Sequence, residues 1–287
     1  PSGRFYLGQT MRTVGSMNTP TDGCLSGRVC LVLGAGTLST GWAIGQAIAI
    51  AYARAGAQVM VGDLNLEAAQ ATVRFIHSQG AQAQACEVDV TNEASVQNAV
   101  ARTVSQFGAL HVLHNNVGIG KSGDSAKTSA SDWQRISDAN LLALHLASQA
   151  AIPSMRQAGG GVILCTSSIA SQRYVGIPHL AYGVTKAATN QFCKMMAVEY
   201  APDNIRVNAL VVGLVDTPRI RNTLMGTYGQ DEEAMVRRRN AQIPLGQMGD
   251  AWDVANAAVF LASERARFIS GIELVIDGGM SATVRGG

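Results

Sequence analysis

Short hydrophobic segments alternate with longer amphipathic segments from residue 28 almost to the end of the chain, and this alternation restricts the possible folds more than any other feature. The short segments predict seven strands: Val29–Leu33, Val59–Gly62, Ala83–Glu87, Leu110–His114, Val162–Thr166, Arg206–Val212 and Ile272–Ile276. The longer segments predict helices: Ile44–Ala55, Leu66–Gln79, Glu93–Phe107, Ser131–Gln157, Ala181–Tyr200 and Asp250–Ala262. Strands that alternate with helices of this length indicate βαβ units. The sequence therefore predicts an α/β fold, built on a single doubly wound parallel sheet with helices on both faces.

The alternation of predicted strands and helices continues without a linker, so residues 17–287 are expected to form one domain. Residues 1–16 are expected to be a tag or a disordered lead, because Gly15-Ser16-Met17 resembles a cloning remnant followed by a start methionine. Residues 1–16 also lack the apolar block of a signal peptide, and no charge-free apolar run in the sequence approaches the roughly 18 residues of a membrane span. We therefore expect no membrane partner.

Composition and charge exclude several classes of protein. Hydrophobic residues make up 47% and charged residues 15% of the chain, which permits a large core and argues against disorder. A formal net charge of +2 is too small to indicate a nucleic-acid partner, and the one basic run, at 237–239, is interpreted as a solvated helix face. The five cysteines form no C-x-x-C pair, so we expect neither a metal site nor a disulfide framework, and a reducing, cytoplasmic location.

A glycine-rich loop follows the first predicted strand directly. It reads G-A-G-T-L-S-T-G-W-A-I-G from Gly34 to Gly45 and opens a helix. Glycines permit a tight turn and close approach of the backbone, and the helix N-terminus offers free N–H groups to a pyrophosphate. The alternative is a glycine-rich turn that binds nothing. Trp42, inside the loop, is expected to pack against a bound adenine or a neighbouring helix.

Polar residues stand at the ends of the next strands. Asp63 ends the second strand, 18 residues beyond Gly45, where a carboxylate can bind both ribose hydroxyls and repel a 2′-phosphate, so NAD is favoured over NADP. Asp89 follows the third strand and N-N-V-G at 115–118 follows the fourth. Each of these residues alone could be a turn residue. Together they indicate one ligand crevice at the carboxyl edge of the sheet.

Tyr182 and Lys186 lie four residues apart at the start of a predicted helix, so their side chains share one helix face. An ammonium beside a phenol stabilises the phenolate, which makes the pair suitable for proton transfer. Ser168, after the preceding strand, could hold a substrate oxygen beside the phenol. Taken alone, such a pair is more often a solvated helix face.

The order and spacing of these pieces resemble those of the short-chain dehydrogenase/reductase family over about residues 24–281. The resemblance rests on the glycine-rich loop, Asp63, Asp89-Val90, the N-N-V-G segment, Asn140, Ser168, Tyr182-x-x-x-Lys186 and V-N-A-L-V-V-G-L-V-D-T-P at 207–218. It implies a Rossmann fold and an NAD-dependent oxidoreductase that interconverts a secondary alcohol and a ketone by hydride transfer. The alternatives are an NADPH-dependent ketone or 3-oxoacyl reductase, which Asp63 disfavours, and a non-catalytic dinucleotide-binding protein.

The resemblance also implies residue roles. Tyr182 would be the general acid/base, Lys186 would stabilise its phenolate and bind the nicotinamide ribose, Ser168 would orient the substrate, and Asn140 would bend its helix and hold a water. Asp89 would contact the adenine amino group, Asn115 the cofactor near the adenosine ribose, and Thr217 the carboxamide. The full set of implied cofactor-binding residues is Gly34, Gly36, Gly41, Ile44, Gly45, Asp63, Asp89, Val90, Asn115, Asn116, Gly118, Tyr182, Lys186, Gly213, Val215 and Thr217.

The chain departs from the family pattern in three places. The glycine-rich loop is five residues longer and has Ala43 at the middle glycine position, so Gly41 could serve instead. N-N-V-G replaces the commoner N-N-A-G, and V-V-G at 211–213 replaces a proline-containing segment. None of these changes removes a catalytic group.

The substrate side of the expected site is less defined. Tyr174 and His179 fall where a substrate pocket is expected, and Arg219 and Arg221 lie in a segment, about 215–245, expected to form a lid. The two arginines could attract an anionic substrate or be solvated lid charges. His111 and His114 are spaced so that they point to opposite faces of a strand, so we interpret them as core or turn residues and not as metal ligands.

The two longest predicted helices, Ser131–Gln157 and Ala181–Tyr200, are rich in Leu, Ala and Met. The family resemblance implies that such helices form subunit interfaces. We therefore expect a homotetramer, with a dimer as the alternative.

Overall fold

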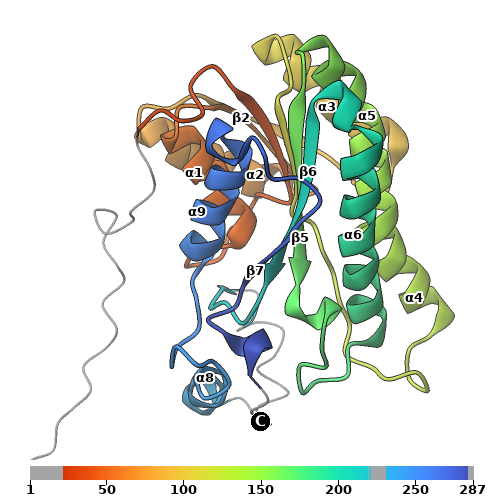
Figure 1. Cartoon of the computed structure of the whole chain (residues 1–287). Coiled ribbons are helices and arrows are strands. Elements are labelled where there is room, and N and C mark those ends of the chain that lie inside the picture. The colour runs from red at the N-terminus through yellow and green to blue at the C-terminus, as the bar shows by residue number, and fades with distance from the viewer. Residues whose placement is uncertain (1–21, 219, 221–230, 284–287) are drawn as a thin grey trace, which may run out of the picture.

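The computed structural model describes residues 22–218, 220 and 231–283, and within these residues seven strands form one parallel sheet (Figure 1). The strands are β1 Val29–Leu33, β2 Gln58–Asp63, β3 Ala83–Glu87, β4 Val112–Asn115, β5 Gly161–Ser168, β6 Ile205–Val212 and β7 Glu273–Ile276. Their order across the sheet is β3-β2-β1-β4-β5-β6-β7. The predicted fold class is therefore confirmed, and each predicted strand is found with its ends shifted by two residues at most.

Helices cover both faces of the sheet (Figure 1). One layer contains α1 Ile44–Arg54, α2 Leu66–Ser78 and α9 Ala251–Ala262, and the other contains α3 Glu93–Phe107, α5 Ala143–Gln157 and α6 Leu180–Glu199. Two shorter helices, α4 Ala130–Ser137 and α8 Glu232–Asn240, lie near the carboxyl edge. Within the described part of the chain, no helix is long and apolar enough to cross a membrane.

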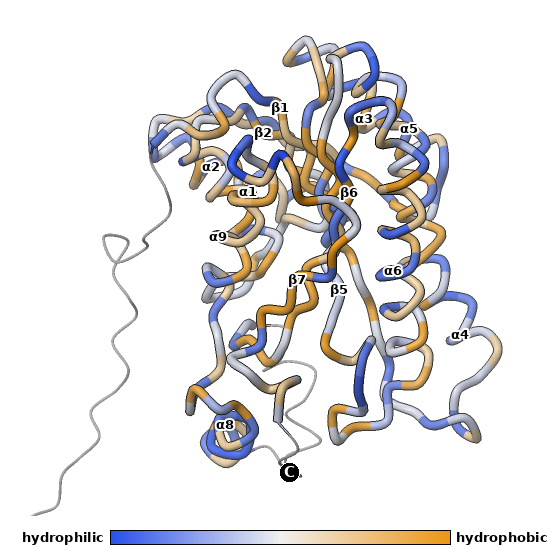
Figure 2. Tube along the Cα trace, viewed as in Figure 1, coloured by the Kyte–Doolittle hydropathy of each residue, from blue (hydrophilic) through white to orange (hydrophobic). Residues whose placement is uncertain are grey.

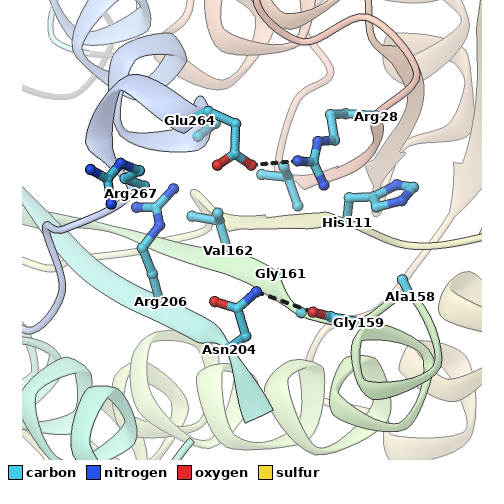
Figure 3. A pocket seen from close by; sticks show the side chains of 13 residues that line it. Arg28, His111, Ala158, Gly159, Gly161, Val162, Asn204, Arg206, Glu264 and Arg267 are labelled. Atoms are coloured by element: carbon cyan, nitrogen blue, oxygen red, sulfur yellow. Dashed lines mark hydrogen bonds and ion pairs between the residues drawn. The ribbon is translucent and has the colours of Figure 1, made fainter. Parts of the chain in front are cut away.

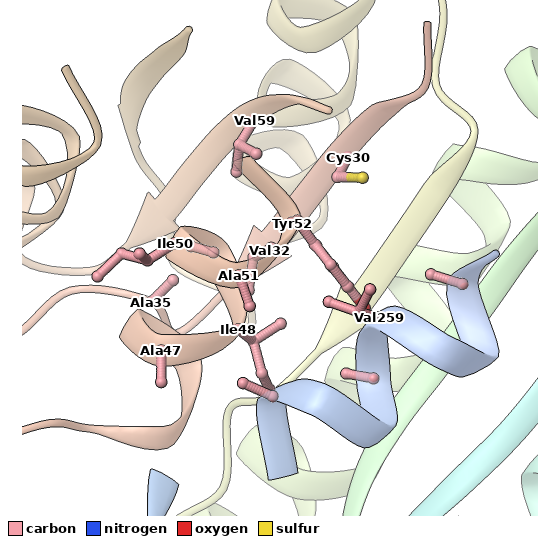
Figure 4. Packing of buried hydrophobic residues seen from close by; sticks show 14 of the residues in the cluster. Cys30, Val32, Ala35, Ala47, Ile48, Ile50, Ala51, Tyr52, Val59 and Val259 are labelled. Atoms are coloured by element: carbon pink, nitrogen blue, oxygen red, sulfur yellow. The ribbon is translucent and has the colours of Figure 1, made fainter. Parts of the chain in front are cut away.

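Two hydrophobic clusters, one on each face, hold the layers together. The strands are largely hydrophobic along their length, whereas α8 is mostly hydrophilic (Figure 2). Ile48 and Tyr52 of α1 pack against Val259 of α9 and against the sheet (Figure 4). Cys30, Cys86 and Cys165, each in a strand, are all buried.

The long helix predicted at Ser131–Gln157 is not regular. α4 passes into one π-helical turn, Asp138–Leu142, before α5 begins. A π turn contains one more residue per turn than an α-helix, and such turns often occur at functional sites. Asn140, which the family resemblance implies bends its helix, lies within this turn.

Two details of the chain differ from the sequence-based expectations. The 237–239 run was expected to be a solvated face, but Arg239 is buried, and its Nε lies 3.1 Å from the Met248 sulfur. Periodicity could not show this, because the loop after α8 folds back over that side of the helix. The described residues do not include the expected lead at 1–16. They also leave out part of the expected lid, namely Arg219 and residues 221–230, which include Arg221.

The sheet has its topological switch point between β1 and β4. From β1 the chain builds outward to β3, then returns to β4 and builds outward in the other direction. Loops that leave adjacent strands in opposite directions leave a crevice at the carboxyl ends, which is where doubly wound sheets bind ligands. The glycine-rich loop after β1 and the N-N-V-G segment at the end of β4 border this crevice.

Candidate active site

The glycine-rich loop is held to the end of β2 by Asp63. One carboxylate oxygen of Asp63 accepts a hydrogen bond from the backbone N–H of Gly36 at 2.9 Å, and the other accepts one from Asn65 at 3.0 Å. A Cβ at Gly36 would lie 2.8 Å from Ala68, so the loop lies directly against the first turn of α2. Each oxygen keeps a further lone pair, so the carboxylate can accept hydrogen bonds from a ligand in the crevice.

The switch point is closed by a contact between Asn116 and the glycine-rich loop. The Asn116 amide donates to the carbonyl of Gly34 at 2.9 Å. Gly34 has a φ of +75°, which favours glycine. A Cβ at Gly45 would stand 2.1 Å from the Gly34 oxygen and 2.4 Å from the Asn116 nitrogen, so only glycine permits this approach. Ile44, the first residue of α1, packs against the core beside them.

Three other candidates from the adenine side differ in where their side chains point. The Asp89 carboxylate accepts two hydrogen bonds from Thr91, at 2.9 Å from its backbone and 2.7 Å from its hydroxyl, and so shapes the turn after β3. Val90 is buried beside it. Asn115 is 4% exposed, and its amide donates to the Cys165 sulfur at 3.8 Å. Its side chain therefore faces the core, whereas Asn116 faces the loop.

Tyr182 and Lys186 lie on α6, which runs beside β5. The Lys186 side chain is 3% exposed, and its ammonium nitrogen lies 5.7 Å from the centre of the Tyr182 ring. The same ammonium donates to the backbone carbonyl of Thr166 at 2.8 Å. A Cβ at Gly118 would lie 2.8 Å from this ammonium, so Gly118 leaves room for it. The pair thus meets the N-N-V-G segment at Gly118.

The two neighbouring serines at the end of β5 have different surroundings. Ser167 is buried, and its hydroxyl donates to the carbonyl of Lys186 at 3.2 Å. Ser168 is half-buried, and its hydroxyl oxygen accepts a hydrogen bond from Ala170 at 3.2 Å, which caps the short helix Ile169–Ser171. The Ser168 hydroxyl proton stays available to a substrate oxygen. The hydroxyls of the two serines therefore differ in their partners, and the substrate-orienting role of Ser168 stays a prediction.

Asn140 connects three segments around the site. Its carbonyl oxygen accepts from the Ile119 backbone N–H at 2.7 Å, and its amide donates to the Ile119 carbonyl at 2.9 Å and to the Thr185 hydroxyl at 3.0 Å. Thr185 in turn donates to the carbonyl of Tyr182 at 2.9 Å. Asn140 therefore fixes both the segment after β4 and the first turn of α6, while its role in holding a water stays a prediction.

The segment after β6 forms the nicotinamide side of the expected site. A Cβ at Gly213 would lie 2.5 Å from the Asp277 side chain, and Val215 pairs with Gly249 in an isolated bridge. Thr217 is 8% exposed and is followed by Pro218. Gly41, with a φ of +97°, would place a Cβ 3.3 Å from Pro218. The extended glycine-rich loop therefore touches this segment across the crevice.

The candidate substrate residues are not equivalent. His179 precedes α6, and its ring centre lies 6.3 Å from that of Tyr182. Burial lowers the pKa of His179 below its usual value, which favours the neutral imidazole. Tyr174 is 71% exposed. Of these two residues, His179 is the one placed beside Tyr182.

The other two histidines considered, His111 and His114, have hydrogen-bond partners within the protein. His111 accepts a hydrogen bond from the Val29 backbone at 3.0 Å, and His114 is fully buried between Tyr52 and Thr166. Over the described residues, no group of three or more His, Cys, Asp or Glu side chains could hold a metal ion.

A polar cavity of about 210 Å³ lies at the opposite edge of the sheet, around the amino ends of β1, β4, β5 and β6 (Figure 3). The Arg206 guanidinium in its wall donates to the carbonyls of Leu261, Ser263 and Ile269, which end α9 and begin the next loop. Arg28 is paired with Glu264 at 2.5 Å. The charges of this cavity thus fasten α9 to the sheet, far from Tyr182 and Lys186.

The sequence did not reveal Thr166 as a residue that shapes the site. Thr166 holds Lys186 through its carbonyl and contacts Asn116 through its hydroxyl, at 3.1 Å. It stands in an apolar strand with no motif of its own. Trp42 packs edge-on against Phe75 and Trp252, at 5.1 and 5.2 Å between ring centres. These contacts anchor the extended loop to its helix layer, and packing against a neighbouring helix is one of the two alternatives predicted for Trp42.

Comparisons with known proteins agree with this geometry. A family model described as enoyl-(acyl carrier protein) reductase matches residues 39–281. The chain is 36% identical over 260 residues to 2,5-dichloro-2,5-cyclohexadiene-1,4-diol dehydrogenase LinX of Sphingobium indicum, covering 91% of this chain and 98% of that protein.

Two solved structures are similar over most of both chains. A protein from Burkholderia xenovorans, described as a short-chain dehydrogenase/reductase, superimposes with a TM-score of 0.88 at 40% identity, covering 91% of this chain and 99% of that one. A 7α-hydroxysteroid dehydrogenase in complex with NADH and 7-oxo glycochenodeoxycholic acid gives a TM-score of 0.77 at 31% identity, with 90% and 96% covered.

Proposed function

Because this chain belongs to the short-chain dehydrogenase/reductase family, we propose that it interconverts a secondary alcohol and a ketone with NAD(H), and that Tyr182 is its general acid/base. The observation that carries this proposal is the buried Lys186 ammonium, 5.7 Å from the Tyr182 ring centre, at the carboxyl edge of the sheet. Relatives named for the oxidation of ring alcohols, such as the diol and hydroxysteroid dehydrogenases, support the same reaction class.

The residues around the crevice fit a dinucleotide. The close approach of Gly34, Gly45 and Asn116 leaves no room for side chains where a pyrophosphate would meet the start of α1. A bound nicotinamide dinucleotide would supply the hydride acceptor or donor. Asp63 would accept the hydroxyls of the adenosine ribose, and Lys186 those of the nicotinamide ribose.

Side chains of the protein transfer the proton. In oxidation, the Tyr182 phenolate takes the hydroxyl proton of the alcohol, and in reduction the phenol returns it to the developing alkoxide. The Lys186 ammonium stabilises the phenolate because it is close, buried and positively charged. Ser168 donates its hydroxyl proton to the substrate oxygen and holds it beside Tyr182. Asn140 keeps the first turn of α6 in place through Thr185.

The preference for NAD over NADP rests on the Asp63 carboxylate. It stands at the end of β2, fixed by Gly36 and Asn65, and a 2′-phosphate placed there would bring two negative charges together. No Lys or Arg occurs between Gly34 and Gly45 or at the two positions after Asp63 to compensate.

We propose a homotetramer in a reducing, cytoplasmic environment. Exposed hydrophobic residues follow one side of α6, namely Val184 (45% exposed), Met195 (52%) and Val198 (76%), and their spacing of 11 and 3 residues places them on one helix face. Such a stripe is suited to burial against another copy of the chain. The free cysteines, four of them buried in the described structure, suit a reducing compartment.

The proposal is tested by titrating the protein with NADH and NADPH while its tryptophan fluorescence is recorded, followed by turnover assays on cyclic and acyclic secondary alcohols. We expect tighter binding of NADH and turnover of at least one secondary alcohol that needs Tyr182. Binding without any turnover, on the alcohols or on the matching ketones, would favour a non-catalytic dinucleotide-binding protein. Preference for NADPH would favour the reductase alternative.

A further inference from the structure

A chain of side-chain hydrogen bonds runs beneath the crevice, from the last turn of α1 to the glycine-rich loop. The Tyr52 hydroxyl lies 2.9 Å from His114 Nδ1, and His114 Nε2 lies 3.0 Å from the Thr166 hydroxyl. Thr166 contacts the Asn116 side-chain oxygen at 3.1 Å, and the Asn116 nitrogen contacts the Gly34 carbonyl at 2.9 Å. The chain therefore joins α1, β4 and β5 to the first residue of the loop.

The direction of every hydrogen bond in this chain follows from the Gly34 carbonyl at the end of the chain. The Gly34 carbonyl can only accept, so Asn116 turns its NH₂ group to Gly34 and its oxygen to Thr166. The Thr166 hydroxyl must then donate to Asn116, and it accepts from His114 Nε2. His114 therefore carries its proton on Nε2, and its Nδ1 accepts from the Tyr52 hydroxyl.

The chain is sealed from solvent. Tyr52 and His114 are 0% exposed and Thr166 is 9% exposed, so water cannot replace a lost partner without rearrangement of the core. Burial lowers the pKa of His114 to about 3, which leaves the ring neutral at pH 7 and able to donate one hydrogen bond and accept another. A neutral histidine is the state that the chain requires.

Thr166 connects this chain with the catalytic pair as well. Its hydroxyl belongs to the chain, and its carbonyl accepts from Lys186 at 2.8 Å. The His114 ring thus lies one residue away from both the loop-holding amide of Asn116 and the ammonium of Lys186, although it touches neither.

We propose that His114 is a positioning residue for the dinucleotide, which acts through Thr166 and Asn116 to hold the Gly34 carbonyl and with it the glycine-rich loop. The inference rests on the proposed function, because it assumes that this loop binds a dinucleotide. A purely structural role would make His114 only a partner for the buried Tyr52 hydroxyl. The two roles differ in what happens to cofactor affinity when the His114–Thr166 bond is lost.

The first experiment compares His114→Leu, His114→Gln and Tyr52→Phe with the unchanged protein. His114→Leu removes the donor to Thr166, so we expect the Kd and the KM for NADH to rise roughly tenfold while kcat at saturating cofactor stays within about twofold. His114→Gln keeps a donor and an acceptor, so most of the affinity should return. Tyr52→Phe removes only the far end of the chain and should change the Kd by less than about threefold.

Two outcomes would overturn the inference. One is an unchanged Kd in His114→Leu. The other is an equal loss of affinity and kcat that His114→Gln does not restore, which would indicate general loosening of the core. Failure of the unchanged protein to bind either dinucleotide would refute the proposed function instead.

A second measurement needs no ligand and no stable variant. Nitrogen NMR of protein labelled with ¹⁵N-histidine should show the His114 ring protonated on Nε2 alone and unchanged between pH 5.5 and 8, with its signals assigned by their absence in His114→Gln or by contacts to Tyr52. A ring protonated on Nδ1, or one that titrates in this range, would contradict the chain of hydrogen bonds on which the inference depends.

Discussion

Lys186 donates a hydrogen bond from its buried ammonium to the backbone carbonyl of Thr166, over 2.8 Å. This bond ties α6 to β5, so α6 cannot rotate about its axis without breaking a buried charged contact. Ser167 adds a second tie between the same two elements, from its hydroxyl to the Lys186 carbonyl at 3.2 Å. The face of α6 that carries Tyr182 is therefore fixed toward the crevice before any ligand binds.

Replacing Tyr182 by Phe should lower kcat by roughly 10²–10⁴-fold, because it removes the proton donor and acceptor but keeps the ring. The Kd for NADH should change by less than about threefold, since the Lys186 contacts to Thr166 remain. Tyr200→Phe, at the far end of α6, is the matched control and should retain normal turnover. Steady-state rates together with fluorescence titrations measure both quantities, and a near-normal rate in Tyr182→Phe would refute the assigned role.

Replacing Asp63 by Asn tests the basis of cofactor preference. The amide keeps one oxygen to accept from Gly36 but loses the negative charge. We expect NADPH to bind roughly tenfold more tightly than to the unchanged protein, and NADH less tightly, because the repulsion of a 2′-phosphate is removed. Paired titrations with the two dinucleotides measure the change, and Glu199→Gln, which removes the same charge at the exposed end of α6, is the control. An unaltered ratio of the two Kd values would show that another group sets the preference.

Replacing Gly45 by Ala should break the contact between Asn116 and the glycine-rich loop. The new Cβ would stand 2.1 Å from the Gly34 carbonyl oxygen and 2.4 Å from the Asn116 amide, so the loop must move away. We expect loss of NADH binding by more than tenfold and destabilisation by about 1–3 kcal/mol, typical of overpacking. Thermal unfolding and NADH titration measure both effects. A variant that binds NADH normally would show that this close approach is dispensable.

Order along the chain was enough to predict the sheet and to place Asp63, Asn116, Tyr182 and Lys186 at one edge, because parallel strands bring their carboxyl ends together. Periodicity reports which face of an element is buried, but not which residue from another element it meets. His114 and Thr166 are 52 residues apart in the chain, so their hydrogen bond could not be inferred. The π turn around Asn140 was equally hidden, since it changes the helix by a single residue.

Replacing Met195 by Glu tests the proposed assembly. Met195 lies in the exposed hydrophobic stripe of α6, and a carboxylate buried there between two copies of the chain would be strongly unfavourable. We expect the variant to dissociate into smaller species while its thermal stability as a folded chain is retained. Gln106→Glu, which adds the same charge to the exposed surface of α3, is the control. Light scattering measures the mass, and a single particle of the 30.0 kDa chain mass for the unchanged protein would refute the assembly itself.

Acid should destabilise the protein partly through His114. Burial lowers the pKa of His114 to about 3 in the folded chain, against 6.5 when it is unfolded, so between these values the unfolded state binds more protons. The contribution of His114 to the free energy of unfolding is therefore fully present above pH 6.5. It falls as the pH drops toward 3, by up to about 1.4 kcal/mol per pH unit. His111 and His179, whose pKa values are also lowered by burial, act in the same direction.

Replacing His114 by Gln should remove this contribution while it keeps a donor and an acceptor in the core. Urea unfolding at pH 7, 6, 5 and 4.5 should give a shallower decline in the variant than in the unchanged protein, because the contribution of His114 to the decline is removed. If the unchanged protein and His114→Gln lost stability in parallel over this range, the buried ring could not be the group that excludes the proton.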